Sequence, residues 1–111
     1  MTIRWSKQAI DDLSATAAYV AQTFGRQSAV NLRDSINDSI EKLAQFPQLG
    51  VVSFADEKTG VEFRELESRL NNIVYTIYNN EIYIVSIWSN RQNRDKLYSA
   101  LRRVAKEIFQ S

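Results

Sequence analysis

The chain has 111 residues, of which 44% are hydrophobic, and a formal net charge of +1. This length suits one folded domain, so we expect a single domain over residues 1–111. Cysteine and histidine are both absent, which excludes disulfides, thiolate metal sites, a cysteine nucleophile and the commonest general base. We therefore expect no metal and no cofactor, and any catalysis must use Lys, Arg, Tyr, Glu, Asp or Ser.

The charge is unevenly distributed along the chain. Residues 1–60 carry six basic and seven acidic side chains, residues 61–90 carry two and four, and residues 91–111 carry six and two. A concentrated basic segment can attract a phosphate backbone or an acidic protein surface. No stretch resembles a signal peptide or approaches the roughly 20 apolar residues of a membrane helix, so we expect a cytoplasmic protein without membrane contact.

The first half of the chain predicts a short strand and two helices. Residues 3–5 alternate apolar and charged side chains, and Ser6 can cap the helix that follows. Two apolar series at helical spacing are separated by Gly25, which predicts an antiparallel helical hairpin. The series are Ile10, Leu13, Ala17, Val20 or Ala21, and Phe24, followed by Ala29, Leu32, Ile36, Ile40 and Leu43. We interpret the polar residues Asp11, Asp12, Arg33, Asp34, Asp38 and Glu41 as solvated surface.

The second half predicts a loop, three strands and a helix. Residues 47–60 hold the only proline and two of the three glycines, which is typical of a loop. Residues 61–67, 73–79 and 81–88 are rich in β-branched and aromatic residues, and Asn79-Asn80 suits a tight turn. The last strand is apolar on nearly both faces, so we expect it to be covered by the hairpin and by a C-terminal helix.

That C-terminal helix shows an apolar stripe of Leu97, Leu101, Val104 and Ile108, with Asn93 as a candidate N-cap. The basic residues Arg102, Arg103 and Lys106 lie in its last turns, where we interpret them as favouring the helix dipole. The predicted fold is α+β, with the element order β-α-α-β-β-β-α.

This order, with FREL at 63–66, IVYTIY at 73–78 and IYIVSIWSNRQNRDKL at 82–97, resembles the RelE/ParE superfamily of bacterial toxins, which includes plasmid stabilisation proteins. The resemblance spans nearly the whole chain. Within it, Arg91 matches the arginine that follows the last strand, whereas Asn93 and Arg94 depart from the family's usual Asp-Pro. The positions Arg64 and Leu66, and Ala9, Asp12 and Leu13, match two shorter patterns.

The resemblance implies the toxin of a type II toxin–antitoxin pair, held inactive by a cognate antitoxin in a hetero-oligomer. We expect an amphipathic helix of the antitoxin to lie across an exposed apolar groove. The superfamily divides by target. ParE-like members bind and poison DNA gyrase, and RelE-like members cleave mRNA on the ribosome. A relative that has lost toxicity and serves as a binding module is a third alternative.

The residues favour the gyrase alternative. RelE-like enzymes without a catalytic histidine use lysines and arginines on the sheet, but residues 63–67 contain no lysine and residues 71–73 no arginine. If the chain is a nuclease, its catalytic residues would be Arg91, Tyr98, Arg64 and Glu65, with Glu62 or Glu67 as further candidates for the base. An acidic sheet would repel phosphates.

Binding to gyrase requires a complementary surface, for which we expect Trp88, Arg91, Arg94 and Tyr98 to be the contacts, since aromatic and arginine residues anchor interfaces. Each also has a structural alternative. Trp88 and Tyr98 could pack in the core, Arg91 could be held by a carboxylate such as Glu65, and Arg64 could belong to a charged strand face with cross-strand pairs.

Overall fold

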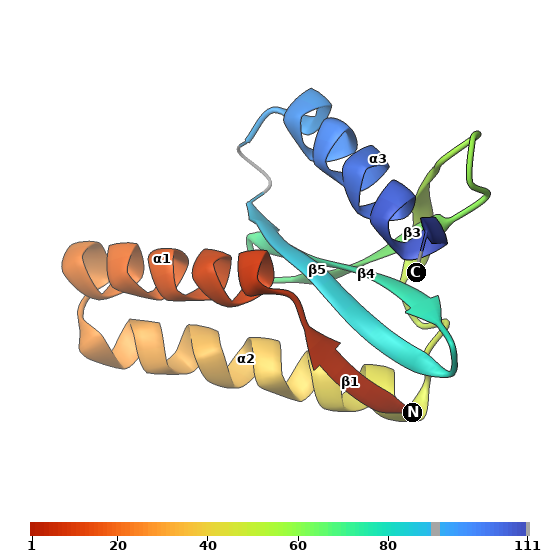
Figure 1. The fold of residues 1–111 in the computed structure, drawn as a ribbon. Helices are drawn as coiled ribbons and strands as arrows, with labels where there is room; N and C mark the ends of the chain where they lie inside the picture. Colours follow the sequence, from red (N-terminus) through yellow and green to blue (C-terminus); the bar gives the residue numbers. More distant parts are fainter. Residues whose placement is uncertain (90–91, 111) are drawn as a thin grey trace.

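The computed structural model describes residues 1–89 and 92–110. Along the chain lie β1 (Thr2–Trp5), α1 (Lys7–Phe24), α2 (Arg26–Gln45), β2 (Val51–Ala55), β3 (Glu62–Ser68), β4 (Asn71–Tyr78), β5 (Glu81–Ser89) and α3 (Arg94–Gln110). Figure 1 shows the α1–α2 hairpin on one side of the sheet and α3 on the other. The predicted α+β class is confirmed.

The five strands form one sheet in the order β1-β5-β4-β3-β2. β1 pairs with β5 in parallel, and the other neighbouring strands are antiparallel. As predicted, β5 lies inside the sheet and is covered on both faces. Asn79 and Asn80, with φ of 50° and 61°, form the tight turn between β4 and β5.

The helical hairpin packs mainly through α2. All five apolar residues predicted for its inner face are buried, whereas the series predicted for α1 is only partly correct. Ile10 and Phe24 are 51% and 67% exposed, and α1 buries Ala9 and Ala17 instead. Small side chains at the contact let α1 approach the sheet closely, so the predicted stripe on this helix was wrong at both of its ends.

The start of α1 is joined to β5 by side chains. Ser6 Oγ accepts a hydrogen bond from Ala9 N at 2.9 Å, as the predicted cap, and donates to Val85 O at 2.8 Å. Asp12 Oδ2 accepts hydrogen bonds from Ser86 Oγ at 2.7 Å and Ile87 N at 3.2 Å. The predicted exposure of Asp12 was therefore wrong.

The Asp12 contact lies next to a β-bulge in β5. Val74 pairs with Ser86 and Tyr75 with Ile84, which leaves Val85 without a partner on β4. β1 pairs with β5 only as far as Trp5 opposite Ile84, so the N–H of Ile87 lies beyond that ladder, and buried N–H groups need an acceptor. The carboxylate of Asp12 supplies one and so joins α1 to β5 past the end of β1.

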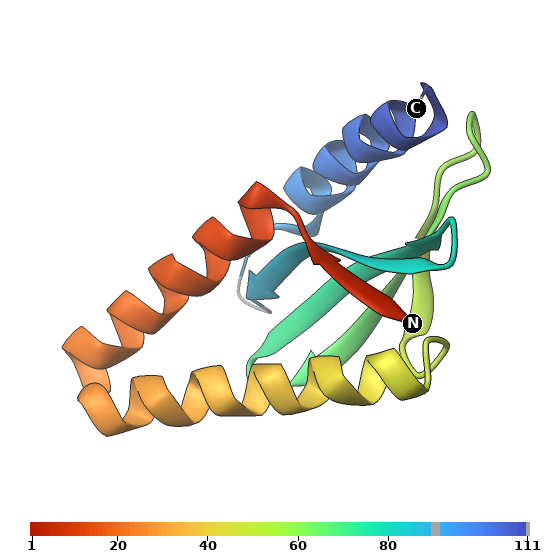
Figure 2. The ribbon, with the colours of Figure 1, turned by 60° about the horizontal axis from the view of Figure 1, so that its bottom comes forward.

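On the opposite face of the sheet, Leu97, Leu101 and Ala105 of α3 bury against Phe63 and Val74. Asn93 Oδ1 accepts a hydrogen bond from Asp95 N at 2.8 Å, which agrees with the predicted N-cap. Figure 2 shows the C-terminal half of α3 beside the hairpin that connects β2 to β3.

The predicted loop at 47–60 contains a strand, because residues 51–55 pair with β3 at the edge of the sheet. The register shifts between Val52 and Phe54, so Ser53 is the extra residue of a bulge. Proline and glycine indicated a loop correctly for residues 47–50. They gave no sign of the short strand that follows.

Residues 47–50 are anchored by one buried tyrosine. Tyr75 Oη donates to Pro47 O at 2.7 Å and accepts from Gly50 N at 2.9 Å. A Cβ atom on Gly50 would lie 2.8 Å from Glu65 O and from the Tyr75 ring, so only glycine fits there. Burial raises the pKa of the Tyr75 hydroxyl, which keeps it protonated and able to donate.

We expect Tyr75→Phe to lower the free energy of unfolding by about 2 kcal/mol, because it leaves the buried Gly50 N–H without an acceptor. Urea denaturation measures the loss. Tyr78→Phe, at a side chain that is 41% exposed, is the matched control and should change stability by less than about 0.5 kcal/mol. Equal effects of the two substitutions would contradict the role assigned to Tyr75.

Candidate functional site

An ion pair joins the start of α3 to the sheet. Arg94 Nη1 donates to Glu65 Oε2 at 3.0 Å, and Nη2 donates to Oε1 at 2.8 Å. Asn72 Nδ2 on β4 also donates to Glu65 Oε1, at 2.8 Å. The Glu65 side chain is only 6% exposed, while that of Arg94 is 45% exposed. Both carboxylate oxygens are thus occupied in a paired geometry that suits guanidinium and carboxylate groups.

The environment of Glu65 favours its charged form. Burial alone would raise the pKa of this carboxyl group, but hydrogen bonds from neighbouring side chains, Arg94 foremost, outweigh the burial and lower it. At neutral pH, Glu65 is an ionised and fully bonded acceptor. Such a group stabilises structure, whereas a general base works best with a pKa near the pH of the reaction.

Two aromatic side chains lie behind this ion pair. The Tyr98 ring stacks on Phe54 with centroids 5.0 Å apart and an angle of 14° between the planes, and the Arg94 guanidinium lies 6.0 Å from the Tyr98 centroid. Trp88 is partly buried against the same core. Arg94 and Tyr98, two of the four predicted target contacts, therefore lie together at the start of α3, while Trp88 lines a separate pocket with Leu97 and Asp12. Arg91, the fourth, is outside the described residues.

The described residues predicted for a nuclease do not all come together, since Arg64 lies apart from Glu65 and Tyr98. Arg64 and Glu65 are successive residues of β3, so their side chains leave opposite faces of the sheet. Arg64 Nη1 donates to Gly50 O at 2.7 Å and to Gln48 O at 3.3 Å, which ties it to the anchored loop. Glu65 faces α3 with Tyr98. The interpretation of Arg64 as part of a cross-strand charge pair was also wrong, since its partners are carbonyl oxygens.

Two contributors to this region were missed by the sequence analysis. Asn72 was noted only because arginine was absent from its segment, and Phe54 fell within the predicted loop. The apolar stretch at residues 51–55, bounded by Gly50 and Asp56, was the available signal for Phe54. Nothing local in the sequence connects Asn72 to Glu65, because that contact depends on the register of β3 against β4.

A family model described as the ParE toxin of the type II toxin–antitoxin system parDE matches residues 3–94. The chain belongs to the ParE toxin family. This confirms the prediction of the RelE/ParE superfamily and of a closer relation to ParE than to RelE. The chain is the toxin of a type II toxin–antitoxin system. The match ends at Arg94, so most of α3 lies beyond it.

Two solved structures resemble this ParE family member. The chromosomal ParDE toxin–antitoxin system from P. aeruginosa is 24% identical with a TM-score of 0.65, covering 80% of this chain and 95% of that chain. The heterotetrameric YoeB–YefM toxin–antitoxin complex from Staphylococcus aureus is 21% identical with a TM-score of 0.49, covering 81% and 97%. At these identities the likeness concerns the fold. Comparison with curated proteins found no match.

Within residues 1–89 and 92–110, no cluster of three or more acidic side chains could hold a metal ion. In the same part of this ParE family member, no helix is both long enough and apolar enough to cross a membrane.

We expect Arg94→Ala to destabilise the protein by about 2 kcal/mol, because it leaves the buried Glu65 carboxylate with Asn72 as its main partner. Lys96→Ala, at an exposed position in the same turn, is the matched control and should stay within about 0.5 kcal/mol of wild type. Thermal and urea unfolding test the pair. If both variants are as stable as wild type, the ion pair does not hold α3 to the sheet.

Acidification should reveal the Glu65 contribution. Since its folded-state pKa lies below the ordinary value of 4.5, the unfolded chain binds more protons as the pH falls. The stabilisation is complete above that ordinary pKa and is lost as the pH drops through the folded-state pKa. The free energy of unfolding of Glu65→Gln should therefore fall less steeply than that of wild type over about pH 5 to 3. The charge-matched control is Glu67→Gln, at an exposed position two residues further along β3. The same flattening in both variants would count against Glu65.

Proposed function

We propose that this toxin acts on DNA gyrase through the surface at the start of α3, and that a cognate antitoxin neutralises it. The observation that carries the choice of target is the state of Glu65, which is ionised, buried and bonded through both oxygens to Arg94 and Asn72. Metal-free cleavage of RNA needs a base for the 2′-hydroxyl, a donor for the leaving oxygen and a cationic clamp. The most buried carboxylate of β3 is poorly suited to act as that base.

The other nuclease candidates are also committed to contacts within the protein. Arg64 is bonded to loop carbonyls on one side of the sheet, and the Tyr98 ring is stacked on Phe54 on the other side. A cleavage site needs its acid, base and clamp around one phosphate. This separation supports a role in binding over a role in RNA cleavage.

A binding surface makes use of the same geometry. The Arg94 guanidinium is half exposed and is held by Glu65 in front of Tyr98, so little rotational freedom is lost when a partner contacts it. Arginine and aromatic side chains are common anchors of protein interfaces. Tyr98 contributes to this surface mainly by packing behind Arg94. We include Trp88, which lines a neighbouring pocket with Leu97, and Arg91 on the family resemblance.

The antitoxin has a separate candidate surface on the helical hairpin. A groove between α1 and α2 is lined by Ala17, Ala18, Ala21 and Ala29, with Arg26 and Arg33 at its margins. Val30 beside it is 41% exposed. Small side chains allow a partner helix to approach closely, and we propose that an amphipathic antitoxin helix binds here in a toxin–antitoxin hetero-oligomer.

We expect the purified toxin to inhibit supercoiling by gyrase, and its induced expression to trigger a DNA damage response before translation slows. Arg91→Ala should weaken inhibition at least about tenfold, as expected for an interface anchor. Lys42→Ala, on the exposed face of α2, is the control and should inhibit like wild type. Circular dichroism and urea unfolding of both variants separate a lost contact from a lost fold.

Two outcomes would contradict the gyrase target. Codon-positioned cleavage of mRNA on translating ribosomes, lost in Arg91→Ala, would identify a nuclease. Expression without the antitoxin and without any growth defect would identify a non-toxic binding module.

A further inference from the structure

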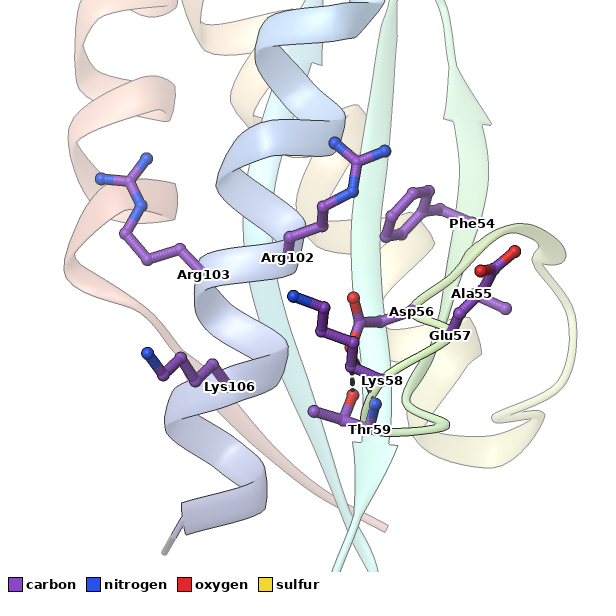
Figure 3. A pocket seen from close by; sticks show the side chains of 9 residues that line it. All are labelled: Phe54, Ala55, Asp56, Glu57, Lys58, Thr59, Arg102, Arg103 and Lys106. Carbon is purple, nitrogen blue, oxygen red and sulfur yellow. Dashed lines mark hydrogen bonds between the residues drawn. The ribbon is translucent and has the colours of Figure 1, made fainter.

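A second cavity, of about 640 Å³, lies between the C-terminal half of α3 and the hairpin that joins β2 to β3. Four cationic side chains line it, Lys58 from the hairpin and Arg102, Arg103 and Lys106 from α3, and we call it the cationic groove. In Figure 3, Lys58 extends toward α3 and Arg102 lies beside Phe54, whereas Arg103 and Lys106 extend from the other side of the helix.

The floor of the cationic groove is aromatic and ordered. Phe54 is stacked on Tyr98, and its ring centroid lies 6.2 Å from that of Phe63. The Arg102 guanidinium lies 5.2 Å from the Phe54 centroid. A guanidinium held over a ring by cation–π attraction keeps its N–H groups free to bind a carboxylate in a paired geometry. Arg102 is therefore oriented before any ligand arrives.

The groove also contains two carboxylates, Asp56 and Glu57, which leave a net charge of +2 among its lining residues. Asp56 stabilises the hairpin, since its Oδ2 accepts hydrogen bonds from Thr59 N at 2.9 Å and Thr59 Oγ1 at 2.7 Å. The hydrogen bond from Thr59, together with the nearby charges of Arg102 and Lys58, lowers the pKa of Asp56. In Figure 3, Glu57 points away from α3. Arg102 and Lys58 therefore remain able to bind an external anion.

The groove also adjoins a free sheet edge. β2 is the last strand in the sheet order, so one side of its backbone has no neighbouring strand among the described residues. Ala55, at the end of β2, also lines the groove. An extended peptide that pairs with β2 would lead directly into the cationic groove, as in strand addition.

We propose that the cationic groove binds an acidic segment of the antitoxin, with carboxylates on Arg102 and Lys58 and an aliphatic side chain against Phe54. The groove is thus a second anchor, separate from the α1–α2 groove. Its α3 residues lie beyond the part of the chain that matches the family model, which ends at residue 94. The proposal rests on the proposed pairing with an antitoxin.

An acidic peptide fits this groove better than a nucleic acid does. The carboxylates of Asp56 and Glu57 would repel the phosphates of a nucleic acid, each of which carries a negative charge. A peptide with alternating acidic and aliphatic side chains matches both the cations and the floor. Charge complementarity of this kind chiefly sets partner choice and the rate of association.

The test uses the full-length toxin and a fluorescent nine-residue peptide of alternating glutamate and leucine, followed by fluorescence anisotropy. A peptide with glutamine in place of glutamate is the uncharged control, and a 20-base-pair DNA duplex is the competing probe. We expect the acidic peptide to bind at least tenfold more tightly than either, and binding to weaken as salt is raised from 50 to 200 mM.

Variants test which residues contact the peptide and whether positive charge in the groove favours binding. Arg102→Ala and Lys58→Ala should each weaken peptide binding about five- to tenfold, while Lys42→Ala, at an exposed position on α2 outside both grooves, should not change it. Asp56→Asn keeps the oxygen that Thr59 needs and removes a negative charge, so it should tighten binding two- to fivefold. Urea unfolding of each variant verifies that the fold is intact.

Three results would overturn the proposal. These are equal binding of the acidic and glutamine peptides, tighter binding of the duplex with the same dependence on Arg102, and undiminished peptide binding by both Arg102→Ala and Lys58→Ala. The assay needs neither gyrase nor toxicity, so its failure is distinct from failure of the proposed target. If the cognate antitoxin, once identified, does not bind the toxin at all, the pairing fails instead.

Discussion

Burial of the middle of the sheet on both faces is the constraint on which the rest of this structure depends. Every residue from Asn71 to Thr76 on β4 is buried. A strand with both faces removed from water needs a layer of apolar side chains on each side. The α1–α2 hairpin supplies one layer and α3 the other, and each meets the sheet through its own cluster of core residues.

The two layers are attached to the sheet in different ways, and the difference explains which side of the molecule presents a candidate binding surface. The hairpin is joined to β5 by Ser6 and Asp12, whose partners lie within the fold. The first turn of α3 is joined by Arg94, whose guanidinium is shared between Glu65 and solvent. The side of the molecule that carries α3 thus combines order with accessible positive charge, and both candidate interfaces on that side use it.

Much of the fold could be predicted from sequence, because its signals are local. Period-two aromatic and β-branched residues identified β3, β4 and β5, and apolar spacing identified α2 completely. The predictions that failed concern residues whose burial is determined by tertiary contacts. Asp12 looks like a surface residue until β5 presents the N–H group of Ile87 to it, and Ile10 looks like a core residue until Ala9 takes the contact. The strand at residues 51–55 is too short to stand out beside a proline and a glycine.

The candidate site shows the same division. Sequence alone identified the residue types that gather near the start of α3, but it could not assign their partners. Glu65 was considered as a partner for Arg91, which lies outside the described residues, and the structure shows Arg94 bound to it. Glu65 can reach α3 because it leaves the face of β3 opposite to that of Arg64. Register and bulges are properties of pairs of strands, so no single segment contains them.

The bulge at Ser53 has a consequence for the unbound toxin. An open edge strand invites copies of the same protein to join sheet to sheet, which leads to aggregation. By inserting an extra residue, the bulge divides β2 into two short stretches that differ in register with β3. A long, flat self-pairing cannot propagate along such an edge. The interruption therefore counters sheet-to-sheet pairing along an apolar edge where Val51 is 69% exposed.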